Sequence, residues 1–386
     1  MSAVVPVDKA SKNHTAIIQI IRLLATRMLW SSGKPLIAST GLPTSRGWQE
    51  TISTIASSSY SEQHLITAYS LLSDAAVWHT FVGNKHVTFF DIRAQNKDAQ
   101  DRLKTWTLTS SLEDLKGVVK ERPFNILNVS TQQNELEKYR NTPPKLISTA
   151  LKKGALYLQY FSTRAYWHKD TLEVGTMPEE QAKFFQEYQE IIGVKTKLVP
   201  CFDTVVVNTN TDLVEFRVDF APGLNGDKAE SAFAKVMSEF NRTIFPFLTQ
   251  YPVGVGLLNL HPAIDPIYRD EECGSVRALG FVATAMETSS NNQGQIHRRK
   301  NQDFRKDGFH VGGKMNVQKI EPYAIGVAWP KMSEGELYLE LKGSAKALYA
   351  GKLIDVSVAE FLGCMDGNDY DFLADHLLSR LPRLKK

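Results

Sequence analysis

Residues 204–220, TVVVNTNTDLVEFRVDF, carry the clearest fold signal in the chain. In the second half of this stretch, Val214, Phe216 and Val218 alternate with charged residues, which is the two-residue period of a strand with one buried face. The first half is a run of β-branched residues, and the polar NTNTD between the two halves favours a turn. The stretch therefore predicts an antiparallel hairpin. Cross-strand ion pairs suffice to explain its polar face, formed by Glu215, Arg217 and Asp219.

Outward from this hairpin, helical and strand patterns follow one another without a fixed order. Helical signals occur at residues 15–30, 61–78, 110–120, 131–140, 177–193, 227–244 and 369–381, with a Gly- and Pro-rich loop expected at 33–47. Strand patterns occur at 86–93, 104–109, 123–129, 253–260, 276–286, 320–329, 336–342 and 352–359. Hairpins separated by single helices predict an α+β fold with a largely antiparallel sheet and a helical N-terminal segment, because a doubly wound fold needs regular strand–helix alternation.

A domain boundary is predicted at Pro143–Pro144, because proline continues neither a helix nor a central strand and restrains the residue before it. Residues 1–143 would form a mixed α/β domain with a basic amphipathic helix. Residues 144–386 would form an α+β domain with the antiparallel sheet and a basic loop at 287–319. An ordinary loop within one domain is the alternative.

The bulk composition is that of a globular protein: 42% of the 386 residues are hydrophobic, 23% are charged and the formal net charge is +3. Any electrostatic argument must therefore be local. The three cysteines lie far apart, which predicts neither a disulfide framework nor a zinc site. The apolar stretch 15–30 contains Gln19, Arg22 and Arg27, so we expect an amphipathic helix and no membrane partner. A cytoplasmic location is expected.

Two segments depart from this charge balance. Between Lys9 and Gln49 there are six Lys or Arg and no acidic residue. Four of these cations are candidate nucleic-acid contacts: Arg22, Arg27, Lys34 and Arg46. For this segment alone, a helix packed on the core and a loop are a sufficient explanation. Between Gln293 and Lys319 there are seven Lys or Arg and only two Asp.

The second segment has the composition of a nucleic-acid contact. Cations can bind phosphates, unpaired bases can stack on the interleaved aromatic rings, and glycines let the backbone approach closely. A solvated loop between strands is the alternative interpretation. The candidate residues are His297, Arg298, Arg299, Lys300, Phe304, Arg305, Lys306, Phe309, His310 and Lys314.

Catalytic signals are weaker. Glu340 and Lys342 have the spacing of one half of a metal-dependent nuclease site, which also needs an Asp on a neighbouring strand because two carboxylates must share the cation. Alternation with leucines makes a solvated strand face the simpler interpretation. An acidic turn could hold Mg²⁺, although such turns are usually solvated; its carboxylates belong to Asp265, Asp270, Glu271 and Glu272.

Arg305 and His310 also have a spacing compatible with a metal-independent ribonuclease pair, in which His moves the proton and Arg steadies the phosphate. Such pairs sit on helices, and Gly308 argues against a helix here. Phosphate contact without cleavage is therefore the better prediction. No GxxxxGK[ST], GxGxxG or HExxH motif occurs in the sequence.

These patterns predict a protein that binds RNA or DNA mainly through the phosphate backbone, without sequence specificity. It would be a non-catalytic component of a larger assembly, with protein partners or self-association and no cofactor. A nuclease using Mg²⁺ and a scaffold or assembly protein are the two alternatives.

Overall fold

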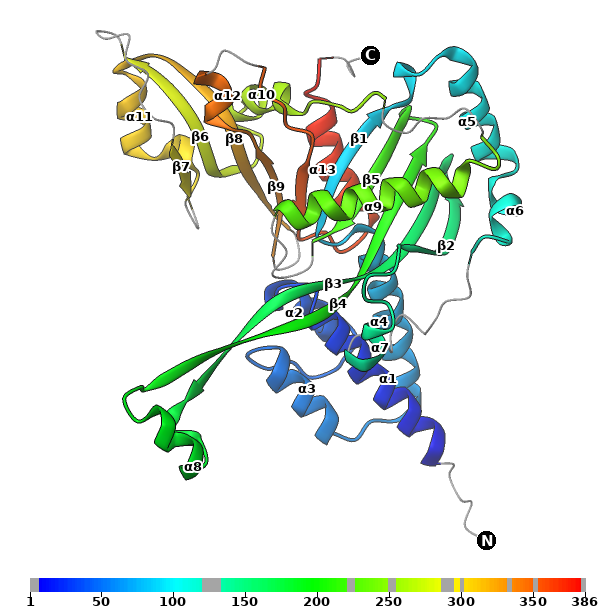
Figure 1. Ribbon diagram of the computed structural model, residues 1–386, viewed down its shortest axis with the longest axis vertical. Coiled ribbons are helices and arrows are strands. Elements are labelled where there is room, and N and C mark those ends of the chain that lie inside the picture. The colour runs from blue at the N-terminus through cyan, green and yellow to red at the C-terminus, as the bar shows by residue number, and fades with distance from the viewer. Residues whose placement is uncertain are drawn as a thin grey trace.

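The computed structural model describes residues 7–119, 133–220, 226–248, 255–285, 295–298, 302–331, 335–349 and 353–382. These residues form an α+β fold built on one antiparallel sheet (Figure 1). Within the described ranges the sheet has ten strands in the order β2-β3-β4-β5-β1-β10-β9-β8-β6-β7. The fold class predicted from the sequence is confirmed.

The strands vary widely in length. The predicted hairpin is β4–β5, in which Val205 faces Phe216 and Val207 faces Val214. The strand bounds are β1 Lys85–Asp91, β2 Lys145–Lys152, β3 Ala155–Glu173, β4 Glu190–Asn208, β5 Leu213–Asp219, β6 Ser275–Ala285, β7 Gln295–Arg298, β8 Val317–Pro330, β9 Glu336–Lys342 and β10 Ala359–Leu362.

Helices cover both faces of the sheet and form a separate N-terminal cluster (Figure 1). Within the described residues, every helix is too short or too polar to cross a lipid bilayer. The helix bounds are α1 Val7–Ala25, α2 Trp30–Ser39, α3 Trp48–Ser57, α4 Glu62–Val82, α5 Lys97–Thr109, α6 Ser111–Lys116, α7 Gln133–Glu137, α8 Glu179–Ala182, α9 Gly226–Ile244, α10 Ile264–Arg269, α11 Gly308–Lys314, α12 Ala345–Tyr349 and α13 Gly367–Leu378.

Most of the helices that local signals predicted are present. The apolar side chains on one face of α1, among them Ile17, Ile20 and Ile21, are buried. Ser61 caps α4 by accepting a hydrogen bond from the backbone N–H of His64. The N-terminal helical cluster packs against the sheet through Phe161 and other buried side chains. The predicted strand at 123–129 lies outside the described residues.

Helices replace one sequence prediction in part and another in full. The Gly- and Pro-rich loop begins instead with α2, and Gly33 lies so close to the Trp48 ring that a Cβ would come within 2.1 Å of it. Tertiary packing thus explains a glycine that suggested a loop. The strand expected at 104–109 belongs to α5, which Asn96 caps through the backbone N–H of Ala99 at 2.8 Å and which buries Trp106.

Three other predictions are correct only in part. The helix expected at 177–193 is limited to α8 and a following 3₁₀ turn, and β4 already begins at Glu190. In the expected strand 253–260, the described residues form an isolated bridge between Leu257 and Phe90. Most of the expected strand 352–359 is irregular in its described part, since β10 starts at Ala359.

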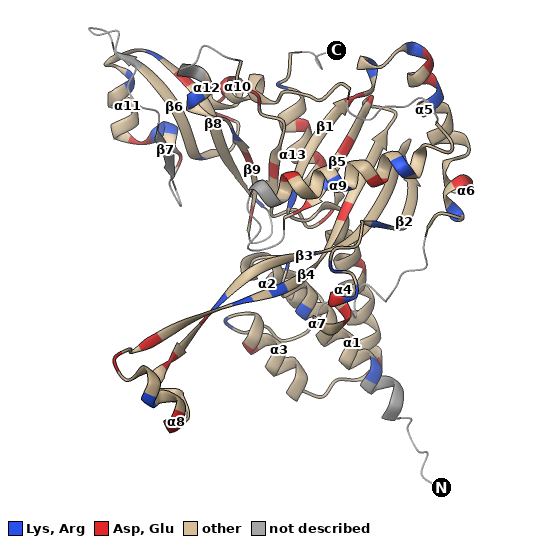
Figure 2. Ribbon diagram, viewed as in Figure 1, with Lys and Arg blue, Asp and Glu red and all other residues tan. Residues whose placement is uncertain are grey.

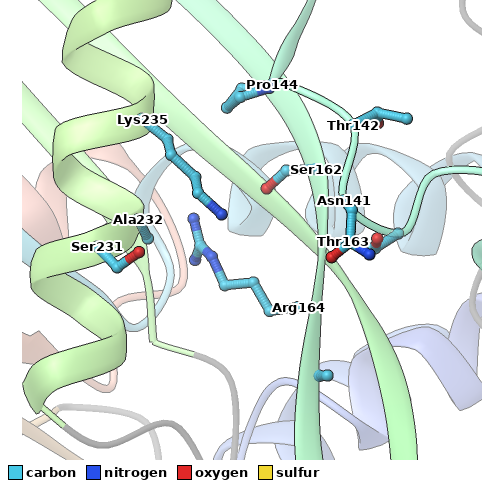
Figure 3. Close-up of a pocket in the computed structure, with 10 residues that line it drawn as sticks. Asn141, Thr142, Pro144, Ser162, Thr163, Arg164, Ser231, Ala232 and Lys235 are labelled. Carbon is cyan, nitrogen blue, oxygen red and sulfur yellow. The ribbon is translucent and has the colours of Figure 1, made fainter.

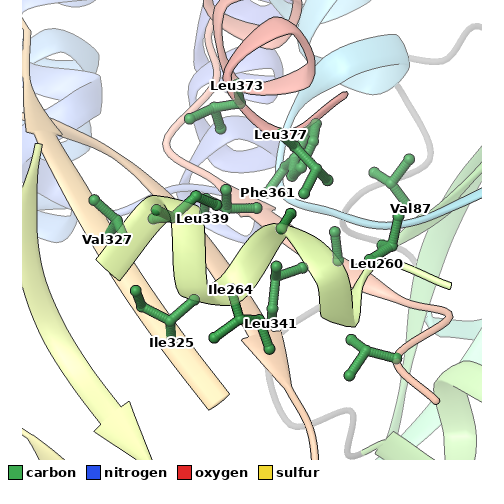
Figure 4. Close-up of a cluster of buried hydrophobic side chains, with 14 of the residues drawn as sticks. Val87, Leu260, Ile264, Ile325, Val327, Leu339, Leu341, Phe361, Leu373 and Leu377 are labelled. Carbon is green, nitrogen blue, oxygen red and sulfur yellow. The ribbon is translucent and has the colours of Figure 1, made fainter. Parts of the chain in front are cut away.

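Each face of the central sheet has its own hydrophobic core. On one face, α9 packs over β4 and β5 through Val236, Phe240 and Phe216. On the other face, α10 and α13 pack on β1, β8, β9 and β10. Figure 4 shows this second core, in which Ile264 of α10 lies over Leu341 and Leu373 of α13 lies near Phe361.

The β3–β4 hairpin continues beyond the sheet as a two-stranded arm, defined here as residues 164–199, with α8 at its tip (Figure 1). Large apolar side chains are exposed along it: Trp167 is 77% exposed, Phe184 83% and Ile192 57%. Most Lys and Arg of the arm lie nearer the sheet and most Asp and Glu lie farther out, although Lys183 lies beside α8 at the tip (Figure 2). Such an apolar surface on a projecting hairpin is typical of an interaction site.

The sheet also bears on the predicted domain boundary. Strand β1 precedes Pro143–Pro144 in the chain. It pairs with β5 on one side and β10 on the other, and both of these strands follow the two prolines. The two predicted parts therefore share one sheet. Their independence as domains stays a prediction.

Candidate nucleic-acid interface

The described part of the predicted basic loop forms a small unit at the β7 edge of the sheet. It contains β7, a 3₁₀ turn at Phe304–Lys306 and helix α11, which Asp307 caps through the backbone N–H of Phe309 and His310. The helix forms although Gly308 argued against it, because the cap satisfies its first donors. His297 and Arg298 lie in β7, and Arg299 and Lys300 lie outside the described residues.

Arg305 holds this unit to the body of the protein. It is only 8% exposed, and its guanidinium donates to the Asp303 carboxylate and to the backbone carbonyls of Asp270 and Gly274. Burial opposes ionisation of Asp303, but the hydrogen bonds from Arg305 outweigh it and hold the pKa of Asp303 below its usual value. This bonding gives Arg305 a structural role.

Phe304 and His310 form the floor of the unit. Both are buried, their rings lie 4.5 Å apart, and the Nε2 of His310 is 2.9 Å from the Tyr268 hydroxyl. His310 thus bonds to Tyr268, whereas Arg305 bonds to Asp303 and to carbonyl oxygens. The structure does not bring the two together as an acid–base pair facing solvent.

The exposed face of α11 keeps the features that a polyanion needs. Phe309 is 86% exposed, and the Lys314 ammonium lies 4.7 Å from the centroid of the Tyr268 ring. Lys306 is also exposed. Phe309 and Lys314 line a cavity of about 190 Å³, whose lining also includes Phe281, His310 and Asp307. We call Lys306, Phe309 and Lys314, together with this cavity, the α11 face.

The four N-terminal candidates differ in their exposure to solvent. Arg27 is directed inward and forms an ion pair with Asp219, with Nη2 and Oδ1 2.7 Å apart. Arg22 and Arg46 are exposed, and Lys34 is half-buried. Only the exposed cations of this segment are placed to contact a ligand directly.

A buried ionic network, which sequence reasoning missed, surrounds Asp219. Lys85, with no exposed surface, donates to the Asp219 carboxylate and to the carbonyls of Thr80 and Phe202. Burial lowers the pKa of Lys85, and Asp219 counteracts this shift. For the acid Asp219, burial acts in the opposite direction and would raise the pKa. The charges of Arg27 and Lys85 nevertheless hold the pKa of Asp219 well below its usual value. The alternation of β5 predicted a polar face, and tertiary packing buries it.

The catalytic candidates lie in two places. Asp270 forms an ion pair with Arg380, which holds the pKa of Asp270 below its usual value, and Glu271 and Glu272 are exposed. Asp265 forms a surface ion pair with Arg269. Among the described residues, no group of three or more His, Cys, Asp or Glu is arranged to hold a metal ion.

Glu340 and Lys342 border a cavity of about 360 Å³ on the α9 side of the sheet. Glu340 is only 6% exposed, so the expected solvated strand face is wrong at this residue. Glu360 of β10 lies directly opposite Glu340 and forms an ion pair with Lys342. Burial, with the charges of Lys342 and Arg164, lowers the pKa of the neighbouring His86 to about 4. Glu360 is thus a carboxylate on the neighbouring strand, where the spacing of a nuclease site required an Asp.

The chain matches no family model among known protein families and no curated protein sequence.

Proposed function

We propose that this protein binds RNA or DNA mainly through the phosphate backbone, as a non-catalytic component of a larger assembly, and that the α11 face is its principal contact. The supporting observation is an exposed aromatic ring, Phe309, beside an aromatic-floored cavity with Lys314 at its rim. Exposing a phenylalanine to this extent costs hydrophobic free energy, which stacking on a base would recover.

The chemistry of this face favours unpaired bases over a duplex. A base stacks on Phe309, and Lys306 and Lys314 bind the flanking phosphates as mobile point charges. Neither lysine carries sequence information, so the binding is expected to be sequence-tolerant. Arg305 and His310 act indirectly by holding the turn and α11 in place. His297, Arg298, Arg299 and Lys300 remain proposed contacts.

Membership of a larger assembly is supported by the arm. A two-stranded hairpin with exposed Trp167, Phe184 and Ile192 offers apolar surface to another protein chain. The outer half of the arm is acidic, whereas the α11 face is basic. One ligand is therefore not expected to cover both surfaces.

The test is a salt titration of binding to labelled single- and double-stranded oligonucleotides. The double variant Lys306→Ala/Lys314→Ala is expected to weaken binding to every sequence and to reduce the slope of log K against log salt by about 0.7 to 0.9 for each phosphate that the variant no longer binds. Phe309→Ala is expected to lose about 1–3 kcal/mol on single strands only. The control is Lys116→Ala/Lys138→Ala, which removes two exposed cations from α6 and the turn after α7.

Equal binding by wild type and the α11 variants would contradict the assignment. Self-association or partner capture that persists at high salt, without any oligonucleotide binding, would favour the scaffold alternative. Mg²⁺-dependent cleavage of the oligonucleotide that Glu340→Gln abolishes would favour the nuclease.

A further inference from the structure

A cavity of about 240 Å³ lies where the arm leaves the sheet, between α9 and the segment that leads into β2. Figure 3 shows Lys235 of α9 and Arg164 of β3 directed toward one another across it. The rest of the lining is polar or small: Asn141, Thr142, Pro144, Ser162, Thr163, Ala165, Ser231 and Ala232. None of these belongs to the α11 face.

The charge of this cavity is not balanced from within. None of the described residues that line it is acidic. Arg164 does form an ion pair with Asp203 behind the cavity wall, but Asp203 and Asp219 together face three cations, namely Arg27, Lys85 and Arg164. The buried network thus has a formal charge of +1, and Lys235 adds another positive charge at the mouth of the cavity. An anion between Lys235 and Arg164 would offset the repulsion between them.

The cavity also offers neutral donors. The hydroxyls of Ser162 and Ser231 line it. The Arg164 guanidinium donates to the Asp203 carboxylate and the Asp219 carbonyl, and a guanidinium has five N–H donors, so others are left for the cavity.

We propose that this cavity binds a phosphate group, held by Lys235 and Arg164 and by the surrounding hydroxyls. Charged donors from two directions together with neutral hydroxyls are the donor set that phosphate oxygens require. The phosphate could belong to a polynucleotide or to a small molecule, since both present the same oxygens. The site is independent of the α11 face, because it uses different residues on a different part of the fold.

The test is isothermal titration calorimetry of the full chain with three probes: inorganic phosphate, a nucleoside monophosphate and a short single-stranded oligonucleotide. Lys235→Ala is expected to weaken binding of at least one probe about tenfold or more, because charge-assisted hydrogen bonds are the strong ones. Lys235→Arg is expected to retain binding. Arg242→Ala is the matched control, since Arg242 is an exposed cation on the same helix and pairs with Glu239 away from the cavity.

The three probes distinguish the source of the phosphate. Lys235-dependent binding of the oligonucleotide alone assigns the cavity to a backbone phosphate, whereas equal binding of the small probes assigns it to a free or monoester phosphate. The Lys306→Ala/Lys314→Ala variant is expected to keep this binding of inorganic phosphate or the monophosphate. Binding of no probe by the wild type, or the same affinities in Lys235→Ala, would overturn the proposal.

Discussion

Lys85 lies in the middle of the sheet with its side chain fully buried, and all three of its ammonium donors have acceptors. A buried charge is tolerated only with such complete bonding, because the cost of removing it from water is several kcal/mol. The same network holds Arg27 of the N-terminal helical cluster and Arg164 at the base of the arm. A few residues therefore connect three parts of the molecule, and removing one of the acids would leave cations buried without partners.

Two histidines near this network predict how stability depends on pH. Burial, with the charges of Arg27 and Lys85, lowers the pKa of His79 to about 3, and the pKa of His86 is lowered to about 4. Both pKa values in the folded state lie below the unfolded value near 6.5. As pH falls, the unfolded chain therefore binds protons that the native state does not bind. Their contribution is complete above about pH 6.5 and is lost toward pH 3–4.

Urea unfolding at pH 7 and pH 5 checks this dependence. Each histidine is expected to reduce the free energy of unfolding by about 2 kcal/mol between these pH values. His79→Gln should remove its share of the difference, whereas His376→Gln, at the surface of α13, should leave it unchanged. An identical pH difference in wild type and His79→Gln would contradict the argument.

At the scale of elements, the arm projects away from the body of the fold (Figure 1). β3 and β4 pair continuously from Ala155–Asn208 to Glu173–Glu190, yet only the inner half of this ladder packs on a core. Backbone pairing alone stabilises a hairpin marginally in water. The exposed apolar residues of the outer half therefore contribute little to the stability of the isolated chain.

Removal of the outer arm is therefore expected to leave the body folded. Tyr166 and Lys197 face each other across the ladder, so replacing residues 167–196 by Asn-Gly gives a two-residue hairpin at that point. The free energy of unfolding should change by no more than about 0.5 kcal/mol, the usual range for surface substitutions. A loss of several kcal/mol in urea unfolding would show that the arm stabilises the body.

At the scale of the whole molecule, the sheet is continuous across the predicted domain boundary. β1 lies between β5 and β10, and Val87 and Phe89 contribute to the same core as Leu339 and Leu373. A fragment without β1 would expose strand edges on both sides and open that core. The fold is therefore expected to form as one unit.

Separate expression of residues 1–143 and 144–386 checks this expectation. Neither fragment should show cooperative thermal unfolding alone, and co-expression should restore it because β1 can then pair. The uncut chain is the control. Cooperative unfolding of either fragment by itself would instead support the domain boundary at Pro143–Pro144.

The sequence by itself determined the elements whose signals are local. The alternation at 214–218 set the β4–β5 hairpin, the stripe of isoleucines set α1, and Ser61 set the start of α4. These features follow from side-chain periodicity and capping, which act within a few residues. The charge excess at 293–319 was equally visible, because it depends on composition alone.

Only the tertiary structure decided which cations of the two basic segments face solvent. Arg27 is buried by an ion pair with Asp219, which is distant in the chain. Arg305 is buried by a turn in which it pairs with Asp303, and the composition did not reveal this turn. Lys306 and Lys314 are left exposed. Arg217 likewise lies 3.5 Å from the centroid of the Tyr370 ring, which α13 brings from more than 150 residues away. The physical reason is that burial depends on which elements pack together, and packing depends on contacts that no local pattern records.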